Sequence, residues 1–364
     1  MRSDRVMVAA MIAVGGVGMA AAQDLPKASG AIRFASYNAA LSADAPGEVV
    51  ARLEGGGDAQ ARAVAEVVQR VRPDVLALQE IDRDGDGRTL AVFVGQYLGT
   101  SQSGAPPIDY PHTVFPPSNT GVPLGVDVDG DGRLERPDDA RGFGRHSGQY
   151  AFALLSRLPL GPVRTFRTFL WRDVPGTRIP ASYYAPAALA VMPLSSKTHL
   201  IAPIQADGGT IHVLAAHPTP PVFDDARDWN GRRNADEIRL LADLLDVRTS
   251  PWAMDDAGAA GGLPVGAHAV VMGDLNADPH RGDARPGAIA RLLDDGRINA
   301  VAPRGAKGTA TASFGGGLRV DYVLPTQGLD VTASGVYWLP DDDPRAALND
   351  ASDHHLVWVD VRLH

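Results

Sequence analysis

Several polar side chains stand at the ends of apolar segments that are typical of buried β-strands. The side chains at these strand ends are Asn38, Glu80, Asp274, Asn276, Asp353 and His354. One acidic residue at a strand end has little meaning, because many strand ends are merely solvated. Carboxylates, carboxamides and an imidazole at the ends of separate strands instead predict one convergent site for metal binding and acid–base chemistry.

The elements that position these residues are expected to be many strands with a few helices between them. Alternating or continuous apolar residues predict strands over 31–38, 74–79, 150–156, 199–204, 210–216, 268–273, 318–324, 330–338 and 355–362. Apolar residues at helical spacing predict helices over 58–71, about 229–246 and about 285–294. This order predicts an α/β protein in which two packed sheets are flanked by helices.

The composition is that of a globular chain with a large core: 364 residues, 45% hydrophobic and 21% charged. There is no internal repeat and no obvious linker, so residues 23–364 are expected to form a single domain. Residues 99–147 are rich in Gly, Pro and Asp and are expected to form one long insertion in that domain.

The first residues have the pattern of an export signal. Arg2 and Arg5 precede an apolar run over 6–22, and Ala20-Ala21-Ala22 forms a small-residue cleavage site before Gln23. A membrane anchor is the alternative, which the short, glycine-rich run disfavours. Residues 1–22 are therefore expected to be a signal peptide, and the mature chain a secreted or periplasmic protein without stable membrane insertion. The sequence has no cysteine, which excludes disulfides and a lipid-modified N-terminal cysteine.

The charge balance is acidic. Removing residues 1–22 takes away two arginines and one aspartate, which moves the formal net charge from −9 to −10. This charge argues against tight nonspecific binding to polyanions. It leaves a phosphorylated substrate possible, because bound divalent cations supply positive charge locally.

Six short motifs in a fixed order carry a resemblance to a known family. They are Ser36-Tyr37-Asn38, Leu78-Gln79-Glu80, Ala216-His217-Pro218, Gly273-Asp274-Leu275-Asn276, Val320-Asp321-Tyr322-Val323-Leu324 and Ser352-Asp353-His354. This series resembles the endonuclease/exonuclease/phosphatase superfamily over residues 31–362. The resemblance implies a four-layer α/β sandwich of two packed, mainly antiparallel sheets flanked by helices. It also implies a metal-dependent hydrolase that acts on phosphoric ester bonds.

In this context Glu80 is the leading metal ligand, with Asn38 beside it as a neutral oxygen ligand or an orienting amide. Asp353 projects to the opposite side from His354, within reach of the metal. Carboxylate and amide oxygens suit a hard cation such as Mg²⁺ or Mn²⁺. Outside this context Glu80 is as easily a solvated strand end, and Asn38 a helix cap or a turn residue.

The catalytic residues that the resemblance implies are His217, Asp274, Asn276, Asp321 and His354. Asp274 is expected to orient or deprotonate the attacking water, and Asn276 to hold a phosphate oxygen or the water; an Asx turn is the alternative. His354 is expected to pair with Asp321. His217 is a candidate for leaving-group protonation or phosphate binding, although residues 148–152 lack the acid that partners this histidine in the nuclease branch.

A second signal lies within the long insertion. Residues 127–138 offer oxygen ligands at the spacing of a calcium loop of the EF-hand or dockerin type, with Gly132 at the sixth position. The loop positions are Asp127, Asp129, Asp131, Arg133, Glu135 and Asp138. The alternative is an acidic surface turn. Residues 82–88 begin in the same way but lack the final ligand, so their calcium binding stays open.

Because the insertion is expected to overhang the strand ends, substrate contacts are sought within it. The candidates are His112, Asn119, Arg145 and His146, each of which is alternatively an ordinary loop residue. No basic stripe interleaved with aromatic residues follows the chain, as it does in proteins that track nucleic acid.

The leading hypothesis is a secreted, divalent-metal-dependent phosphodiesterase. Its substrate is expected to be a nucleic acid, a phospholipid head group or a small phosphodiester, and the chain is expected to be a monomer. The alternative is a catalytically inactive, calcium-stabilised extracellular binding module on the same scaffold. That alternative predicts gaps in the catalytic set, and the six motifs contain none.

Overall fold

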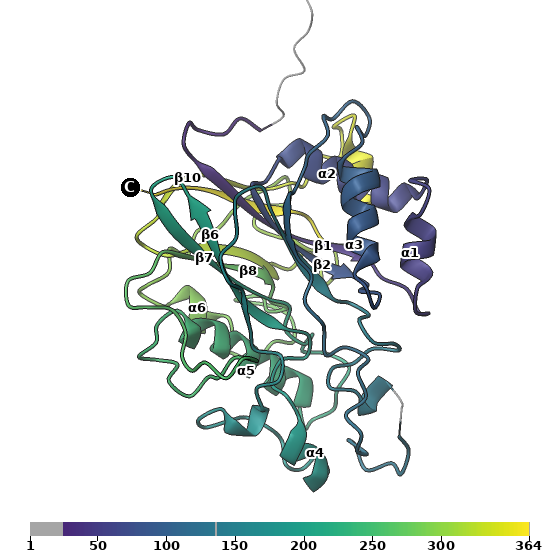
Figure 1. The fold of residues 1–364 in the computed structure, drawn as a ribbon, viewed down its shortest axis with the longest axis vertical. Coiled ribbons are helices and arrows are strands. Elements are labelled where there is room, and N and C mark those ends of the chain that lie inside the picture. Colours follow the sequence, from purple (N-terminus) through teal and green to yellow (C-terminus); the bar gives the residue numbers. More distant parts are fainter. Residues whose placement is uncertain (1–24, 135–136, 364) are drawn as a thin grey trace, which may run out of the picture.

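The computed structural model describes residues 25–134 and 137–363, whose strands form two sheets (Figure 1). The order in the first sheet is β10 (Asp330–Val336), β11 (Val357–Arg362), β1 (Ile32–Leu41), β2 (Val75–Ile81), β4 (Phe152–Ser156) and β3 (His112–Val114). The order in the second is β5 (Arg164–Thr165), β6 (His199–Ala206), β7 (Gly209–Ala216), β8 (Ala269–Asp274) and β9 (Asp321–Pro325). Neighbouring strands are antiparallel except for the pairs β1–β2 and β7–β8, which are parallel. The expected signal peptide, residues 1–22, lies outside the described residues.

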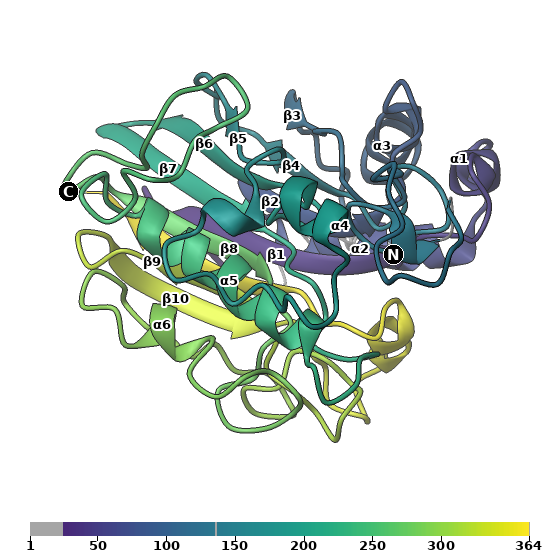
Figure 2. The ribbon, with the colours of Figure 1, turned by 90° about the horizontal axis from the view of Figure 1, so that it is seen from below.

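Helices flank the strands on both sides, as Figure 2 shows for α1 and α3 on one side and α6 on the other. Beside the first sheet are α1 (Glu48–Leu53), α2 (Ala59–Val71), α3 (Arg88–Val92) and the π-helical turn Phe93–Leu98. Beside the second are α4 (Pro186–Val191), α5 (Trp229–Leu244) and α6 (Ala290–Leu293). Short 3₁₀ turns occur at Pro137–Asp139, Trp171–Asp173 and Ala346–Asp350.

Three apolar layers hold the molecule together. The central layer lies between the sheets and includes Phe34, Leu154 and Met272. One outer layer joins the first sheet to α2, and the other joins the second sheet to α5. Two sheets with helices on both outer faces confirm the expected α/β sandwich.

Helix α2 illustrates how local sequence sets an element. The Asp58 side chain caps its N-terminus by accepting a 2.8 Å hydrogen bond from the Ala61 backbone amide. The buried apolar face follows the predicted helical spacing, with Ala61, Val64, Ala65, Val68 and Val71. The helix ends at Arg72, which adopts a left-handed conformation before Pro73, since a proline would clash with a continuing helix.

The structure contains short elements that were not predicted, among them α1, α3, α4 and β5, and it differs from two of the expected segments. The helix expected near 285–294 is only the four residues of α6, since Pro286 and Gly287 precede it and favour an irregular chain. The insertion over 99–147 does not stay outside the sheets, because its residues 112–114 form the edge strand β3. Part of the insertion is therefore built into the first sheet.

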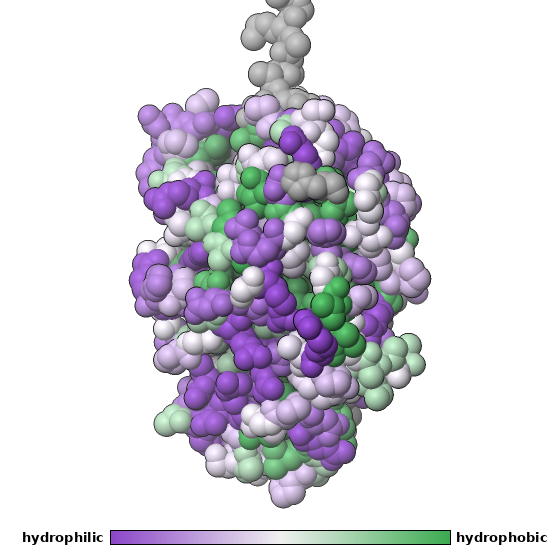
Figure 3. Space-filling model, turned by 90° about the vertical axis from the view of Figure 1, so that its left-hand side faces the viewer, coloured by the Kyte–Doolittle hydropathy of each residue, from purple (hydrophilic) through white to green (hydrophobic). Residues whose placement is uncertain are grey.

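The surface in Figure 3 is mainly hydrophilic, with hydrophobic residues in small separate areas. Across residues 25–134 and 137–363, no helix combines the length and the apolar character needed to cross a membrane.

Candidate active site

The sheet topology brings the polar strand ends to one edge of the molecule. Because β1 and β2 run parallel, Asn38 and Glu80 fall at the same end of the first sheet. The parallel pair β7–β8 places His217, directly after β7, near Asp274 at the end of β8. Strand β9 is antiparallel to β8, and its first residue, Asp321, stands opposite Asp274. Residues far apart in the sequence thus meet at one site.

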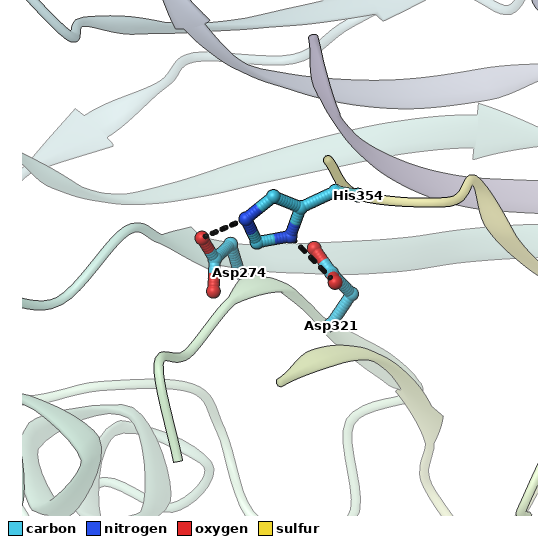
Figure 4. A group of neighbouring side chains, drawn as sticks. All are labelled: Asp274, Asp321 and His354. Carbon is cyan, nitrogen blue, oxygen red and sulfur yellow. Dashed lines mark hydrogen bonds and ion pairs between the residues drawn. The ribbon is translucent and has the colours of Figure 1, made fainter. Parts of the chain in front are cut away.

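His354 lies between two carboxylates, as Figure 4 shows. Its Nδ1 is 2.9 Å from Asp321 Oδ2, and its Nε2 is 3.7 Å from Asp274 Oδ2. Burial alone would lower the pKa of His354, but the two carboxylates outweigh it and raise the pKa to about 10. The ring is therefore an imidazolium at neutral pH. These three residues are close enough to hold a metal, and the ring held between two carboxylates also suits acid–base chemistry, the role that we develop below.

Asp274 stands at the centre of the cluster. Its Oδ2 accepts a 3.1 Å hydrogen bond from the Asn38 amide and lies 3.4 Å from His217 Nε2. Burial would raise the pKa of Asp274, but the charge of His354 and the contacts with His217 and Asn38 hold it well below the usual range. Asp274 is therefore an ionised carboxylate that faces two imidazoles.

Glu80 and Asn38 offer the oxygen atoms that suit a hard cation. The Glu80 side chain is 26% exposed, and its Oε1 lies 3.9 Å from His217 Nε2. Asn38 directs its Nδ2 at Asp274, while its Oδ1 accepts from the Ala40 backbone amide at 3.1 Å. A carboxylate without a guanidinium or ammonium partner, beside an amide oxygen, fits the donor set that Mg²⁺ and Mn²⁺ prefer. Glu80 and Asn38 would hold such an ion.

The backbone is strained around this edge. Ala40, Glu80, Tyr150 and Asn276 all have φ between 49° and 54°, in the left-handed region that non-glycine residues rarely adopt. Strand β1 also carries a register shift between Asn38 and Leu41. Each such residue costs about 1–3 kcal/mol, and strain of this kind gathers at functional sites.

Gly273 allows a close approach between β8 and β7. A Cβ atom at this position would lie 2.0 Å from the Ala216 carbonyl oxygen, and the residue has φ 150°. Only glycine fits there without moving a strand. Because Ala216 and Gly273 directly precede His217 and Asp274, this contact sets how close the imidazole and the carboxylate come.

Asn276 forms the Asx turn that was its alternative role, and its contact with a phosphate oxygen or a water stays a prediction. Its backbone amide donates a 3.0 Å hydrogen bond to Asp274 Oδ1, which makes the Asx turn that the sequence left open. Its side-chain amide donates to the Pro218 carbonyl at 3.1 Å, which ties the loop after His217 to the loop after Asp274. In this structure Asn276 orders the two loops that carry the site.

His217 is a buried imidazole with one unused nitrogen. Its Nε2 faces Asp274 and Glu80, whereas its Nδ1 is buried without a hydrogen-bond partner among the described residues. Residues 148–152 lack the acid that partners this histidine in the nuclease branch, which agrees with the unpaired nitrogen. Burial, together with the nearby charge of Lys197, lowers the pKa of His217, so the ring is neutral at physiological pH.

Lys197 is a site residue that the sequence analysis missed. It is 5% exposed, lies on the approach to β6, and lines the same cavity as Glu80. Burial lowers its pKa, while the charges of Glu237, Glu80 and Asp274 act in the opposite direction. The chain has only three lysines, and the other two, Lys27 and Lys307, form ion pairs with Asp74 and Asp341. Its position directly before a predicted strand was the one available signal.

Asp353 lies apart from the other proposed metal ligands. Its side chain is exposed and borders a different hollow, together with Trp338 and His355. Its carbonyl oxygen accepts from the Ser313 backbone amide at 2.8 Å. Within the described residues, no hydrogen bond or ion pair joins its carboxylate to Glu80 or Asn38, so its metal role stays a prediction.

Two of the four expected substrate contacts have other roles. His112 lies on β3 opposite Ser156, which in turn stands opposite Val75 at the start of β2, the end away from Glu80. Asn119 is fully buried, and its amide donates to the carbonyls of Arg167 and Ser195. His112 is therefore at the wrong end of the sheet, and Asn119 is a structural link.

The other two contacts lie on the loop before β4. Arg145 forms an exposed ion pair with Asp44. His146 Nε2 lies 3.1 Å from the Ala43 carbonyl and 3.5 Å from Asp82. Both residues brace this loop against the chain that follows β1, and their contact with substrate stays a prediction.

Acidic residues of the predicted calcium loop lie close together in the structure, but Asp139 is among them and Asp138 is not. Carboxylate oxygens of Asp127, Asp129 and Asp139 lie within 4.8 Å of one another. Asp139 takes the place that the sequence pattern gave to Asp138, because Pro137–Asp139 forms a 3₁₀ turn that directs Asp139 inward. Asp138 instead borders the cavity beside Glu80.

The remaining loop positions are only partly informative. Asp127 accepts from the backbone amides of Gly130 and Gly132, and Asp131 Oδ1 accepts from that of Arg133. Glu135 lies outside the described residues. In the similar segment over 82–88, Asp82 accepts from the amides of Ala43 and Tyr150, which gives it a structural role.

A two-sheet α/β sandwich whose strand ends hold acids, an amide and two imidazoles defines a class of phosphoester-cleaving proteins. Residues 35–354 match the Endonuclease/Exonuclease/phosphatase family, and the chain belongs to this family. Members of the family are metal-dependent phosphoesterases and nucleases. No curated protein sequence matches the chain.

Solved structures share the fold. An endonuclease/exonuclease/phosphatase from Beutenbergia cavernae is 20% identical, with TM-score 0.53, and the match covers 92% of this chain and 72% of that one. A family protein from Leptotrichia buccalis is 14% identical, with TM-score 0.51, over 91% of this chain and 100% of the other. One from Bacteroides thetaiotaomicron is 14% identical, with TM-score 0.50, over 92% and 98%.

Proposed function

We propose that this chain is an exported, divalent-metal-dependent phosphodiesterase that uses water as its nucleophile. The observation that carries the proposal is the cluster in which Asp274 faces both His217 and His354 beside the free carboxylate of Glu80. Hydrolysis of a phosphodiester needs charge neutralisation, an in-line water and help for the leaving alkoxide. The cluster contains a group for each need.

The roles follow from the protonation states. A divalent cation bound by Glu80 and Asn38 would supply positive charge at the phosphoryl oxygens. Asp274, an ionised carboxylate, accepts a hydrogen bond from the attacking water and aligns it. The His354 imidazolium, held by Asp321, donates to a phosphoryl oxygen. His217 and Lys197 stand on the Glu80 side, where they bind the phosphoryl group and assist the leaving oxygen.

Export and calcium binding are part of the same proposal. The charged and apolar pattern of residues 1–22 supports removal of a signal peptide before Gln23. The converging acids of the 127–139 loop support a calcium ion that orders the long insertion in a chain without cysteine.

A substrate panel tests the proposed activity. The chain 23–364, stripped of metal, is assayed with Mg²⁺ or Mn²⁺ on DNA, RNA, sphingomyelin, bis(p-nitrophenyl) phosphate and p-nitrophenyl phosphate. We expect metal-dependent hydrolysis of at least one diester, at a higher rate than the monoester. The variant Glu80→Gln should lose about 10²-fold or more in turnover, while Glu54→Gln, which changes an exposed residue paired with Arg88, should keep it. Metal-independent turnover, or none on the whole panel, would refute the proposal.

A further inference from the structure

A cavity with aromatic walls opens directly beside the proposed catalytic cluster. Its volume is about 460 Å³, and its lining includes Glu80 and Lys197. This size falls within the range of about 300–1,000 Å³ that is usual for small-molecule sites. Six aromatic residues contribute to the lining: Phe143, Tyr150, Tyr183, Tyr184, Phe223 and Trp229. We call this cavity the aromatic pocket.

One wall of the aromatic pocket is a preformed stack of rings. Tyr183 and Trp229 lie parallel, with centroids 4.0 Å apart and an interplanar angle of 2°. Tyr184 meets Tyr183 edge to face at 4.7 Å and also packs edge to face against the fully buried Trp171. Because Trp171 belongs to the core, the stack is anchored and keeps its shape without a ligand.

Two further aromatic residues are exposed at the pocket. Phe143 is 57% exposed and Phe223 is 90% exposed, although large aromatic side chains are usually mostly buried. Phe223 also has φ 65°, a strained value for a bulky residue. Asn230 fixes this loop, since its side chain donates to the Val222 carbonyl at 2.7 Å and its backbone amide donates to Asp224 at 2.8 Å. An exposed ring held in a strained conformation at a cavity indicates a ligand-binding role.

Two polar groups lie where the aromatic pocket meets the cluster. Thr219, two residues after His217, is 8% exposed, and its buried hydroxyl has no hydrogen-bond partner among the described residues. Buried hydroxyl groups are normally satisfied, so this one indicates a partner from the ligand. Lys197 stands at the same junction and faces Glu80 across it. A phosphate near Glu80 would therefore direct one of its substituents past Thr219 into the aromatic pocket.

The charges around the stack decide which kind of group fits. The Arg227 guanidinium lies 4.8 Å from the Tyr183 ring centroid and 5.3 Å from that of Trp229, so a cation already occupies these rings. Arg227 is itself paired with Asp225, and in the lining Arg233 and Lys197 are balanced by Glu80 and Asp138. A quaternary ammonium group would compete with Arg227 for these rings, whereas a flat neutral ring continues the stack.

We propose that the aromatic pocket receives a flat, uncharged aromatic group that is esterified to the scissile phosphate. Building on the proposed function, this makes the substrate a small aromatic phosphodiester, with a nucleobase or an aryl ring as the group that is recognised. A choline-type phospholipid head group would have to displace Arg227 from these rings, and its binding is an outcome of the test below.

Binding of four phosphoryl compounds to the Mg²⁺-loaded chain 23–364 tests this inference by calorimetry. They are methylphosphonate, phosphocholine, phenylphosphonate and thymidine 5′-monophosphate. We expect the two aromatic compounds to bind about tenfold or more tightly than the first two, as stacking on aromatic side chains implies. The tighter of the two aromatic compounds identifies the source of the ring. Equal affinities for all four, or tightest binding of phosphocholine, would overturn the inference.

Matched variants locate the effect. Phe223→Ala keeps a Cβ in the same backbone conformation and should reduce the preference for aromatic compounds several-fold, with methylphosphonate binding unchanged. Val265→Ala, at an exposed residue outside the pocket lining, should keep the preference. If Phe223→Ala and Phe143→Ala both retain the full preference, the ring binds elsewhere and the inference is wrong. Hydrolysis of bis(p-nitrophenyl) phosphate by the same preparation separates this failure from a failure of the proposed function.

Discussion

His354 Nδ1 and Asp321 Oδ2 lie 2.9 Å apart, and both side chains are buried at the edge where the two sheets meet. The contact fixes the orientation of the ring and stabilises its positive charge. The opposite nitrogen of His354 faces Asp274, which lies opposite Asp321 in the strand register. One histidine therefore connects the carboxylate that orients water with the carboxylate that supports the ring.

Replacing Asp321 by Asn should lower turnover by about 10²–10⁴-fold, the usual contribution of a positioned acid or base. Burial alone would lower the pKa of His354, but the nearby carboxylates, chiefly Asp321, raise it to about 10. The required imidazolium is thus lost only as pH rises toward 10 in the wild type. In Asp321→Asn this alkaline loss should move to lower pH, which a profile of kcat/KM against pH would reveal.

The exposed turn residue Asp207 supplies a matched control for that experiment. Asp207→Asn should leave both turnover and the alkaline limb in place. An unchanged alkaline limb in Asp321→Asn would show that His354 does not act as a charged group.

Lys197→Met should weaken substrate binding more than it slows the chemical step. The side chain is buried next to Glu80 and supplies positive charge on the phosphoryl side, and methionine keeps most of its volume. We expect KM to rise about tenfold, which corresponds to about 1.4 kcal/mol. Steady-state kinetics on the best diester measure this, with Lys307→Met as the surface control. A normal KM would remove Lys197 from the site.

Calcium should stabilise the chain through the 127–139 loop. A ligand that binds only the folded state raises stability, so the melting temperature should increase when calcium is added after chelation. Asp127→Asn should abolish this calcium-dependent increase. Asp139→Asn should reduce the increase more than Asp138→Asn does, because Asp139 belongs to the converging group. The increase, rather than the absolute melting temperature, is compared, because Asp139 also accepts from the Val128 backbone amide. Equal responses in all variants would argue against calcium at this loop.

His355 should make the fold sensitive to acid. It stacks on Trp338 at 3.6 Å, and burial, with the charge of His354, lowers its pKa from 6.5 to about 3. In the unfolded chain the His355 ring binds a proton more readily than in the fold. The contribution of the neutral His355 ring to the stability of the fold is therefore present above pH 6.5 and is lost as pH falls toward 3. His355→Phe preserves a ring and should reduce the loss of stability between pH 6.5 and 5 by at most about 2 kcal/mol. Urea unfolding at both pH values measures it; an identical loss in the variant would contradict the assignment.

The sequence predicted the strands well because their apolar runs are long and local. Residues 199–204 and 210–216 form the β6–β7 hairpin, and the helix predicted over 58–71 is α2, Ala59–Val71. The convergence of Asp274, Asp321 and His354 followed from the motif order, since each residue stands at a strand end.

What the sequence did not predict depends on contacts between distant segments. Lys197 lies in the short link before β6 and is 5% exposed, and its place directly before a predicted strand does not by itself indicate burial. His112 was placed near the site because the insertion was treated as one excursion, whereas pairing with β4 carries it to the other end of the sheet. The aromatic pocket is lined by residues between 80 and 233, so no single sequence motif could predict it.

The tight packing of Gly273 against the Ala216 carbonyl has a consequence for how this protein tolerates change. Any side chain at residue 273 would wedge the second sheet open at the very edge where His217 meets Asp274. Their separation is therefore dictated by the main chain rather than by rotamer choice. A single added methyl group at this glycine would therefore alter the spacing of the two side chains without touching either of them.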